Sequence, residues 1–302
     1  MAPSPKSFGI FDRAGRILVY WYQNQRANGP ENPGNMDIRL PALDLDGTLT
    51  NSEKIITLRT REALMEAQKR GIRLVLASGR PTEGISPLAE ELEMGRYGGF
   101  ILSYNGAEIR EVGSGRLLVQ QTLPADTIPV IAGLAREYGI GVLSYGDGAV
   151  ITEHSDDPYI QLECRINRIP CRPVENFEKA LTHPVPKCLM TGEGDYMGQI
   201  LPRIQEALPD LSVYRSEAYF IEIMPQGIDK ARSLAELLRQ LNLTASQLAA
   251  CGDGYNDISM IAFAGLGVAM ANARPEVQKV ARVITTSNDE DGVAEAVYRW
   301  ML

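Results

Sequence analysis

The chain has 302 residues, of which 44% are hydrophobic and 23% are charged, and its formal net charge is −8. This length exceeds the common single-domain size of about 100–200 residues, so we expect one large or two moderate domains in a soluble globular protein. The acidic balance argues against a nucleic-acid partner, because binding a phosphate backbone requires a basic face. It does not exclude small phosphorylated ligands held at a site that contains a cation.

The chain lacks the familiar signals of zinc sites and of membrane spans. Its four cysteines form no Cys-x-x-Cys pair, and it has only two histidines. We therefore expect reduced thiols and no zinc site built from thiolates or imidazoles. No segment approaches the roughly 20 apolar residues of a membrane helix. The sequence thus predicts a cytoplasmic protein with no membrane partner, and it does not specify the oligomeric state.

Residues 1–35 are predicted to be an N-terminal extension with no part in catalysis. An apolar run at 17–22 is long enough for a short strand, but the residues at 28–35 favour turns and linkers. The run is too short for a secretory signal and has no small-residue cleavage site. A docked extra hairpin is the alternative.

The first core strand is predicted to end at two carboxylates. An apolar run leads into Asp44-Leu45-Asp46, and Gly47 and Thr48 follow at once, which is typical of a buried strand that opens into a loop. Side chains at i and i+2 leave a strand on the same face, so Asp44 and Asp46 can converge on one small volume. Two anions this close need a cation, a shared proton or a reacting centre between them. The alternative is an Asp-Gly turn with an incidental second acid.

A helix and a second strand follow. Thr57 suits the N-cap of a helix over residues 58–70, and the apolar run at 72–77 predicts a strand that ends in Ser78-Gly79-Arg80. Strand, helix and strand in this order form a βαβ unit with parallel strands, so Ser78 should reach the same sheet edge as the two carboxylates. Its hydroxyl and the next backbone N–H suit an oxyanion. An ordinary loop is the alternative.

The middle of the chain has a different pattern. A third strand at 100–104 runs into Asn105 and a hairpin that turns at 113–115. From about residue 122, hairpins alternate with helices in an α+β pattern, which predicts a separate inserted domain over 122–217. The elements expected there are helices at 126–138, 175–181 and 197–208 and strands at 141–145, 149–152 and 187–191.

The core is expected to resume with a strand at 220–224. Lys230 then opens a helix that runs to about residue 241, although most lysines at such positions are solvated surface charges. A strand at 248–251 ends in a second acidic cluster that contains Asp253 and Asp257, where neighbouring glycines permit close backbone approach. A glycine-rich turn is the alternative. Together these strand ends point to one crevice beyond the sheet edge, which is where open α/β sheets bind ligands.

Over nearly all of residues 36–302, the sequence resembles the haloacid dehalogenase superfamily, and within it the Cof-type phosphatases. The resemblance implies a Rossmann-like, doubly wound α/β core over 36–121 and 218–302, with a large α+β cap inserted between the two parts. It also implies Mg²⁺ dependence and dephosphorylation of small metabolites, often sugar phosphates. The matching motifs are Asp44 to Thr48, Ala77 to Arg80, Lys230 and Gly252 to Asp257, with supporting segments at 103–107, 264–273 and 287–294.

The resemblance implies a role for each motif. Asp44 would be the nucleophile that forms an aspartyl-phosphate, and Asp46 would protonate the leaving oxygen and later deprotonate water. Asp253 would bind Mg²⁺ together with Asp44 and the Asp46 carbonyl, with Asp257 in support. The groups that would hold the phosphoryl oxygens are Ser78, Gly79, Lys230 and Asn256.

These residue types also suit phosphoryl transfer on chemical grounds. A carboxyl group with an ordinary pKa of about 3.9 is ionised at neutral pH and can attack phosphorus without a separate base. Its difficulty is repulsion by an anionic substrate, which Mg²⁺ and Lys230 would offset provided that Asp46 begins protonated. Carboxylate, carbonyl, phosphate and water oxygens favour Mg²⁺.

Substrate choice is expected to depend on the cap, because every catalytic group is on the core. Arg80 either contacts phosphate or pairs with an acid. The remaining candidates for substrate contact are Asn105 and Arg215, with Tyr145, Asp147 and Lys187 as further cap positions at which surface decoration is the alternative.

Two other functions share the same residues. A sugar phosphomutase would use the same phosphoenzyme but return the phosphoryl group to a sugar. A catalytically idle ligand-binding or structural protein is the other alternative, and the intact set of Asp44, Asp46, Lys230 and Asp253 argues against it. A dinucleotide oxidoreductase is excluded because the first strand-to-helix turn has no Gly-x-Gly-x-x-Gly.

Overall fold

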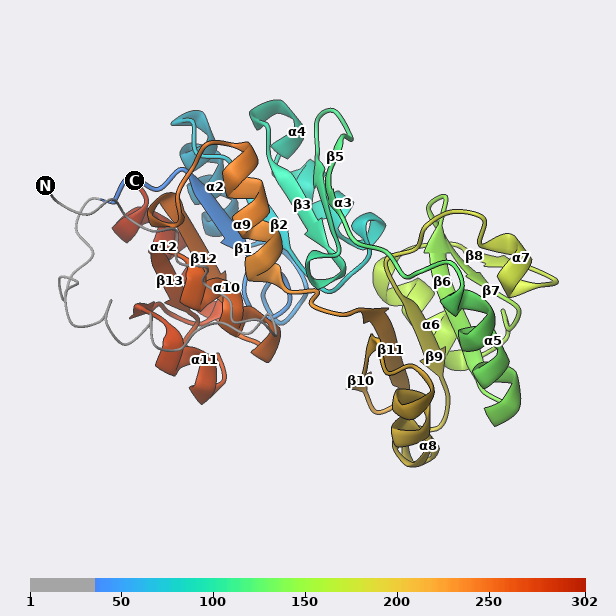
Figure 1. Ribbon diagram of the computed structural model, residues 1–302. Helices are drawn as coiled ribbons and strands as arrows, with labels where there is room; N and C mark the ends of the chain where they lie inside the picture. Colours follow the sequence, from blue (N-terminus) through green and yellow to red (C-terminus); the bar gives the residue numbers. More distant parts are fainter. Residues whose placement is uncertain (1–35) are drawn as a thin grey trace, which may run out of the picture.

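A computed structural model describes residues 36–302 of the protein, which form two lobes that are each built on a sheet of their own (Figure 1). The predictions for residues 1–35 lie outside the described residues. We call the lobe with the larger sheet the core and the lobe with the smaller sheet the cap. The middle of the chain forms the cap, and the segments before and after it form the core (Figure 1).

The core sheet runs in the order β14-β13-β12-β1-β2-β3-β4-β5. Neighbouring strands from β14 to β3 are parallel, and β4 and β5 extend the sheet as an antiparallel hairpin. This arrangement confirms the predicted α/β fold class. The strands are β1 (Leu40–Leu43), β2 (Val75–Ala77), β3 (Phe100–Ser103), β4 (Glu108–Glu111), β5 (Leu117–Gln120), β12 (Leu248–Gly252), β13 (Leu266–Ala269) and β14 (Val283–Ile284).

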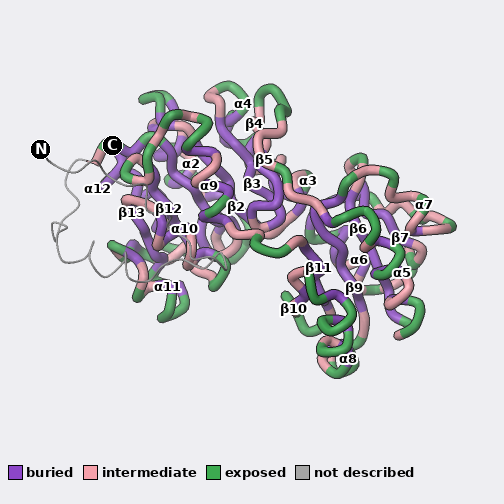
Figure 2. The backbone as a smooth tube through the Cα atoms, viewed as in Figure 1, coloured by how far each residue is buried: buried purple, intermediate pink, exposed green. Residues whose placement is uncertain are grey.

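The central strands of the core are buried along their whole length. Every residue of β1, β2 and β12 is buried (Figure 2), as expected for parallel strands that are covered on both faces. Among the helices, α2 packs against α12 and α9 against α10. The core helices are α2 (Leu58–Lys69), α3 (Thr82–Glu91), α4 (Met94–Tyr97), α9 (Lys230–Gln240), α10 (Ile258–Phe263), α11 (Pro275–Val280) and α12 (Gly292–Trp300). No helix among residues 36–302 is both long and apolar enough to cross a bilayer.

Pro41 lies inside the central strand β1 without interrupting it. It pairs in register with Ala249 of β12, whereas the pairing of β1 with β2 begins only at Ala42. The backbone nitrogen of Asp44 donates to the Cys251 carbonyl of β12, so alternation along the strand turns the Pro41 nitrogen toward the β2 side. The missing N–H therefore falls just before the first β1–β2 pair, where the sheet loses little.

The cap sheet runs in the order β10-β11-β9-β6-β7-β8 and is antiparallel except for the pair β7 and β8. The predicted hairpin of β6 and β7 is present, whereas α6, β8 and β10 had no counterpart among the predicted elements. The strands are β6 (Gly141–Gly146), β7 (Ala149–Thr152), β8 (Cys171–Pro173), β9 (Cys188–Thr191), β10 (Leu211–Glu217) and β11 (Phe220–Pro225). The helices are α5 (Thr127–Tyr138), α6 (Pro158–Asn167), α7 (Phe177–Ala180) and α8 (Gly194–Ala207).

Strand β11 corrects one expectation. The apolar run at 220–224 was assigned to the core, but it pairs antiparallel with β9 and β10 in the cap sheet. The reason is physical: an apolar run specifies a buried strand but not its partners, and here the short turn after β10 folds β11 back onto its neighbour. The exact domain boundaries stay a prediction, and this pairing favours one after Pro225. Four residues, 226–229, then separate β11 from α9.

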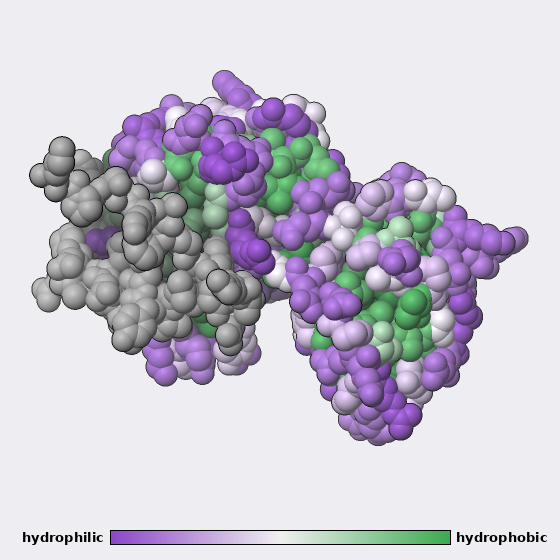
Figure 3. Space-filling view, viewed as in Figure 1, coloured by the Kyte–Doolittle hydropathy of each residue, from purple (hydrophilic) through white to green (hydrophobic). Residues whose placement is uncertain are grey.

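A hydrophobic cluster joins the two lobes, and we call this contact region the seam. Tyr104 and Ala107 of the core pack in one cluster with cap residues that include Tyr145 and Leu189. The rings of Tyr104 and Tyr145 lie 5.5 Å apart at a tilt of 57°. Figure 3 shows the two lobes meeting at a narrow waist. The seam lies beside the carboxyl ends of the core strands, because Tyr104 directly follows β3.

Helix α2 begins as predicted at Thr57, whose side-chain oxygen accepts from the Thr60 backbone N–H. Thr57→Ala should lower the free energy of unfolding by about 0.5–2 kcal/mol, because one orphan N–H at the helix start loses its acceptor. Urea denaturation followed by circular dichroism measures this change. Thr57→Ser keeps the hydroxyl and should stay within about 0.5 kcal/mol of the parent; equal losses in both variants would contradict the capping role.

Candidate active site

The predicted motifs meet at one edge of the core sheet. Strands β12, β1 and β2 are parallel neighbours in register, with Leu43 beside both Cys251 and Leu76. The residues that follow these strands are therefore brought side by side although they are far apart in sequence. Asp44, Asp253 and Ser78 are among them.

Lys230 lies at the centre of this edge. Its helix α9 begins at this residue, and Asp229 caps the helix by accepting from the Arg232 backbone N–H. The Lys230 ammonium is fully buried and donates to Asp44 Oδ1 at 2.7 Å, Asp257 Oδ1 at 2.7 Å and the Ala77 carbonyl at 2.9 Å. Its three N–H donors thus have three short partners. Burial lowers the pKa of Lys230, but Asp257 and Asp44 raise it above the ordinary value overall, so the group stays charged.

Three carboxylates crowd around one small space. Asp44, Asp253 and Asp257 each offer an oxygen, and these oxygens all lie within 4.8 Å of one another. Burial, the Asp257 charge and the Asp253 charge raise the pKa of Asp44 well above its usual value, although Lys230 opposes them. The pKa of Asp253 is also raised, first by burial. One ammonium does not balance three carboxylates, so the cluster has the character of a site for a hard cation.

Backbone and hydroxyl groups fix the orientation of these acids. Asp257 Oδ2 accepts from the backbone N–H of Asp253 at 3.1 Å and of Gly254 at 2.9 Å, and Thr48 donates to Asp253 Oδ1 at 2.8 Å. Gly47 lies against the same carboxylate with φ of +85°, and an added Cβ would come within 2.5 Å of Asp253 Oδ2. This position therefore requires glycine for both conformation and space.

Asp46 has different partners from those expected. Its carboxylate forms a two-point pair with Arg80, at 2.9 and 2.7 Å, and also accepts from Lys54 at 2.9 Å. Burial raises its pKa, but the hydrogen bonds from Lys54 and Arg80 outweigh it and leave the pKa below the ordinary value. In this conformation the two cations favour the ionised form of Asp46, and its protonation at the start of the reaction stays a prediction. Arg80 pairs with an acid, which was one of its two predicted roles.

The predicted phosphate-binding groups lie beside the acids. Ser78 is buried, and its backbone carbonyl accepts from the Asn105 N–H at 2.9 Å. Asn105 has φ of +55°, and its side chain lies close to the Cα of Gly79, where an added Cβ would be 3.1 Å from Nδ2. Asn256 donates to Asn105 Oδ1 at 3.1 Å. The loops next to the carboxylate cluster thus carry four groups suited to phosphoryl oxygens, namely Ser78, Gly79, Asn105 and Asn256.

Comparison with known proteins decides the family. The family model described as haloacid dehalogenase-like hydrolase matches residues 42–297. The chain belongs to this family. A crystal structure of a haloacid dehalogenase-like hydrolase from Bacteroides thetaiotaomicron is similar, with 49% identity and a TM-score of 0.84 over 87% of this chain and 99% of that chain.

Several curated relatives of this haloacid dehalogenase-like hydrolase are named as phosphatases or putative phosphatases. A putative phosphatase of Streptococcus pyogenes is 29% identical and covers 88% of this chain and 100% of its own length. A 5-amino-6-(5-phospho-D-ribitylamino)uracil phosphatase of Bacillus subtilis is 30% identical and covers 89% of this chain and 98% of its own length. The predicted membership is confirmed, and the protein is a phosphatase of the haloacid dehalogenase-like family.

One predicted substrate contact of this phosphatase is not brought to the site. The Arg215 guanidinium donates to the carbonyls of Gly194 at 3.1 Å and Ala218 at 2.6 Å, both in the cap. The prediction rested on a polar side chain at a strand or loop position of the cap, and such a residue on an edge strand gives no information on the direction of its side chain. Two residues of the site went unpredicted in these roles: Thr48, which follows the Asp-Gly pair, and Lys54, which no pattern distinguishes from a surface lysine.

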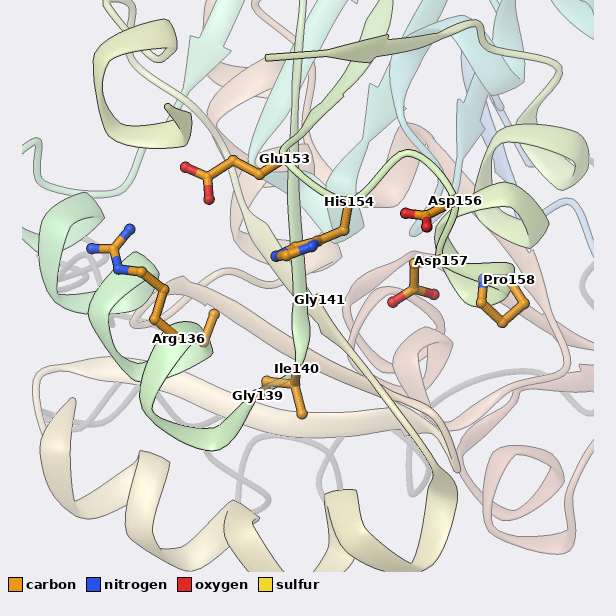
Figure 4. Close-up of a pocket in the computed structure, with 10 residues that line it drawn as sticks. Arg136, Gly139, Ile140, Gly141, Glu153, His154, Asp156, Asp157 and Pro158 are labelled. Carbon is orange, nitrogen blue, oxygen red and sulfur yellow. The ribbon is translucent and has the colours of Figure 1, made fainter. Parts of the chain in front are cut away.

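A pocket in the cap lies away from the carboxylate cluster of Asp44, Asp253 and Asp257. Figure 4 shows its lining in the cap, with Arg136, Glu153, His154 and Asp157 among the side chains. Three of these side chains already have structural partners. Arg136 pairs with Glu178, Glu153 accepts from the Phe177 N–H, and Asp157 caps α6. None of the predicted site residues is among those lining it. The pocket therefore has no part in the phosphatase site.

Lys230→Met should lower the free energy of unfolding by about 3–5 kcal/mol in buffer without divalent cations, because it leaves two buried carboxylates without their shared cation. Urea denaturation measures the change. Lys54→Met is the matched control: it also removes a lysine that pairs with a site aspartate, but the lysine is exposed, and such a pair contributes only about 0–1 kcal/mol. Equal effects of the two substitutions would contradict the central position assigned to Lys230.

Proposed function

We propose that this phosphatase hydrolyses small phosphorylated metabolites, sugar phosphates above all, through an aspartyl-phosphate on Asp44 and with Mg²⁺. The observation that carries the proposal is the meeting of Lys230 with Asp44, Asp253 and Asp257 at one sheet edge. An ionised carboxylate next to excess negative charge destabilises the fold by repulsion. It becomes a suitable nucleophile once a cation and a phosphoryl group occupy the space.

The residues present fit the proposed magnesium ion. Asp44, Asp253 and the Asp46 backbone carbonyl would hold it, with Asp257 as an outer support that is itself fixed by two backbone N–H groups. All of these are oxygen donors, which Mg²⁺ prefers. When bound, the ion would supply positive charge that stabilises the transferring phosphoryl group.

Asp44 would attack phosphorus along the line opposite the leaving oxygen. The new bond joins a carboxylate oxygen to phosphorus, and the bond from phosphorus to the substrate oxygen breaks as that oxygen takes a proton from Asp46. Lys230 holds the other carboxylate oxygen in place and stays charged. Water, deprotonated by Asp46, then cleaves the aspartyl-phosphate, which releases inorganic phosphate and restores the Asp44 carboxylate.

The partners of Asp46 add a condition to this mechanism. Arg80 and Lys54 favour the ionised carboxylate, so Asp46 can deliver a proton only after these ion pairs are weakened. An anionic phosphate that enters beside Arg80 would compete with Asp46 for the guanidinium. We infer that substrate binding itself helps Asp46 to acquire the proton that it donates.

A hydroxyl-rich leaving group is favoured by one relative. The Bacillus subtilis protein at 30% identity is named for a phosphorylated ribitylamino compound, and a ribityl chain is a polyol. The curated relatives named as phosphatases favour water as the final acceptor, which argues against the sugar phosphomutase. A cytoplasmic location stays a prediction.

Asp44→Asn should abolish phosphate release from p-nitrophenyl phosphate and hexose 6-phosphates, because an amide is too weak a nucleophile for the first displacement. EDTA should abolish it in the parent protein, and added Mg²⁺ should restore it. A malachite-green assay for free phosphate measures both. Asp210→Asn, at an exposed cap aspartate, is the control and should keep parent activity. Sustained turnover by Asp44→Asn would remove the nucleophile assignment.

Gly47→Ala should weaken Mg²⁺ binding by about 10–100-fold, the effect typical of a lost outer-shell support, because the new methyl group displaces Asp253. Isothermal titration calorimetry with MgCl₂ measures the affinity directly. Gly115→Ala is the matched control: it also has a positive φ, but an added Cβ there meets nothing within 4 Å. Unchanged affinity in the Gly47 variant would remove Asp253 from the proposed ligand set.

A further inference from the structure

A second buried lysine lies in the seam, on the cap side. Lys187 precedes β9, and only 3% of its surface is exposed. Its ammonium lies 3.4 Å from the carbonyl of Gly79, in the loop predicted to bind phosphate. It also lies 5.9 Å from the ring centre of Tyr104 and 5.6 Å from that of Tyr145. A cap cation is thus in contact with the phosphate loop of the core.

The hydrogen bonding of Lys187 is incomplete. Its ammonium has three donors, but its polar contacts within residues 36–302 are the Gly79 carbonyl at 3.4 Å and Glu222 Oε1 at 3.5 Å. Short bonds from an ammonium to a carboxylate are about 2.7–2.9 Å, and Lys230 makes contacts of that length. The two buried lysines both contact the backbone of residues 77–79, but they differ in their hydrogen bonding. Lys230 has three short partners, whereas Lys187 can still bind a closer one.

Glu222 is the acidic counterpart of Lys187. It lies on β11 with 8% of its surface exposed, and its Oε2 accepts from the Tyr214 hydroxyl at 3.0 Å. On the core side, the side chain of Asn105 accepts from Asn256 at 3.1 Å.

We propose that Lys187 and Glu222 bind the leaving group of the substrate and select one that is uncharged and rich in hydroxyls. The proposal rests on the proposed function, since a leaving group exists only if a phosphoester is cleaved. A hydroxyl can donate to Glu222 and accept from Lys187 at once, which completes both partly satisfied groups. A second phosphate group would meet the Glu222 carboxylate and be disfavoured.

A purely structural ion pair makes a different prediction. If Lys187 and Glu222 only held the cap on the core, replacing either would impair all substrates alike. If they bind the leaving group, the loss depends on whether that group carries hydroxyls. Comparison of a hexose 6-phosphate with p-nitrophenyl phosphate, whose leaving group has no such hydroxyls, therefore separates the two roles.

The experiment measures kcat/KM of the Mg²⁺-loaded enzyme for glucose 6-phosphate and for p-nitrophenyl phosphate. Lys187→Met and Glu222→Gln should each lower the ratio of the two values by about tenfold or more, the effect of losing a hydrogen bond to a charged group. Glu222→Gln should also improve turnover of fructose 1,6-bisphosphate relative to fructose 6-phosphate. Arg172→Met, which breaks an exposed cap ion pair with Asp147, is the matched control and should leave both ratios at the parent value.

Two further measurements keep the outcome unambiguous. The inhibition constant of inorganic phosphate should not change in Glu222→Gln, because phosphate alone does not reach the cap groups. Calorimetric titration of glucose 6-phosphate into Asp44→Asn protein, with and without Glu222→Gln, reports leaving-group binding without turnover. Equal losses on both substrates, or unchanged hexose phosphate affinity, would overturn the proposal. Failure of the proposed function has a different signature, namely no phosphate release from any ester by the parent enzyme.

Discussion

The Lys230 ammonium is the interaction on which the rest of this structure depends. It draws together carboxylates from the loops after β1 and β12 and a carbonyl at the end of β2, so one side chain joins three segments of the core. Full burial makes this arrangement costly unless every charge has a partner. The carboxylates exceed the cations at this edge, and that excess gives the fold its capacity for a divalent ion. The balance of negative charge around Lys230 is therefore required both for the stability of the fold and for the binding of a divalent ion.

Much of the core was predictable because its signals are local. Buried parallel strands appear as apolar runs in the sequence. The polar residues that follow these runs were correctly predicted to lie at the edge formed by the carboxyl ends of the core strands. The capping hydroxyl of Thr57 also predicted the start of α2. Strand partners are a different matter, because pairing depends on residues distant in sequence. The run at 220–224 shows this limit: its composition indicated burial, but β9 and β10 decided that it belongs to the cap.

The site divides in the same way. Asp44, Asp253 and Lys230 follow motifs whose spacing indicates a common edge, and they do meet. The protonation of Asp46 depends on Arg80 and Lys54, and no spacing rule places two flexible cationic side chains on one carboxylate. Arg215 shows the converse, since a plausible charge turned toward backbone carbonyls of the cap. Side-chain direction at exposed positions is set by tertiary contacts that a single sequence does not express.

The four residues between β11 and α9 connect the cap sheet directly to the helix that begins with Lys230. One end of this short tether carries the strand of Glu222, and the other delivers Lys230 to the carboxylates. A cap exchanged between relatives would therefore also bring along the spacing that sets the position of the Lys230 ammonium. The length of this exit segment is thus constrained, because a residue added or lost there would shift Lys230 relative to the carboxylates that it binds.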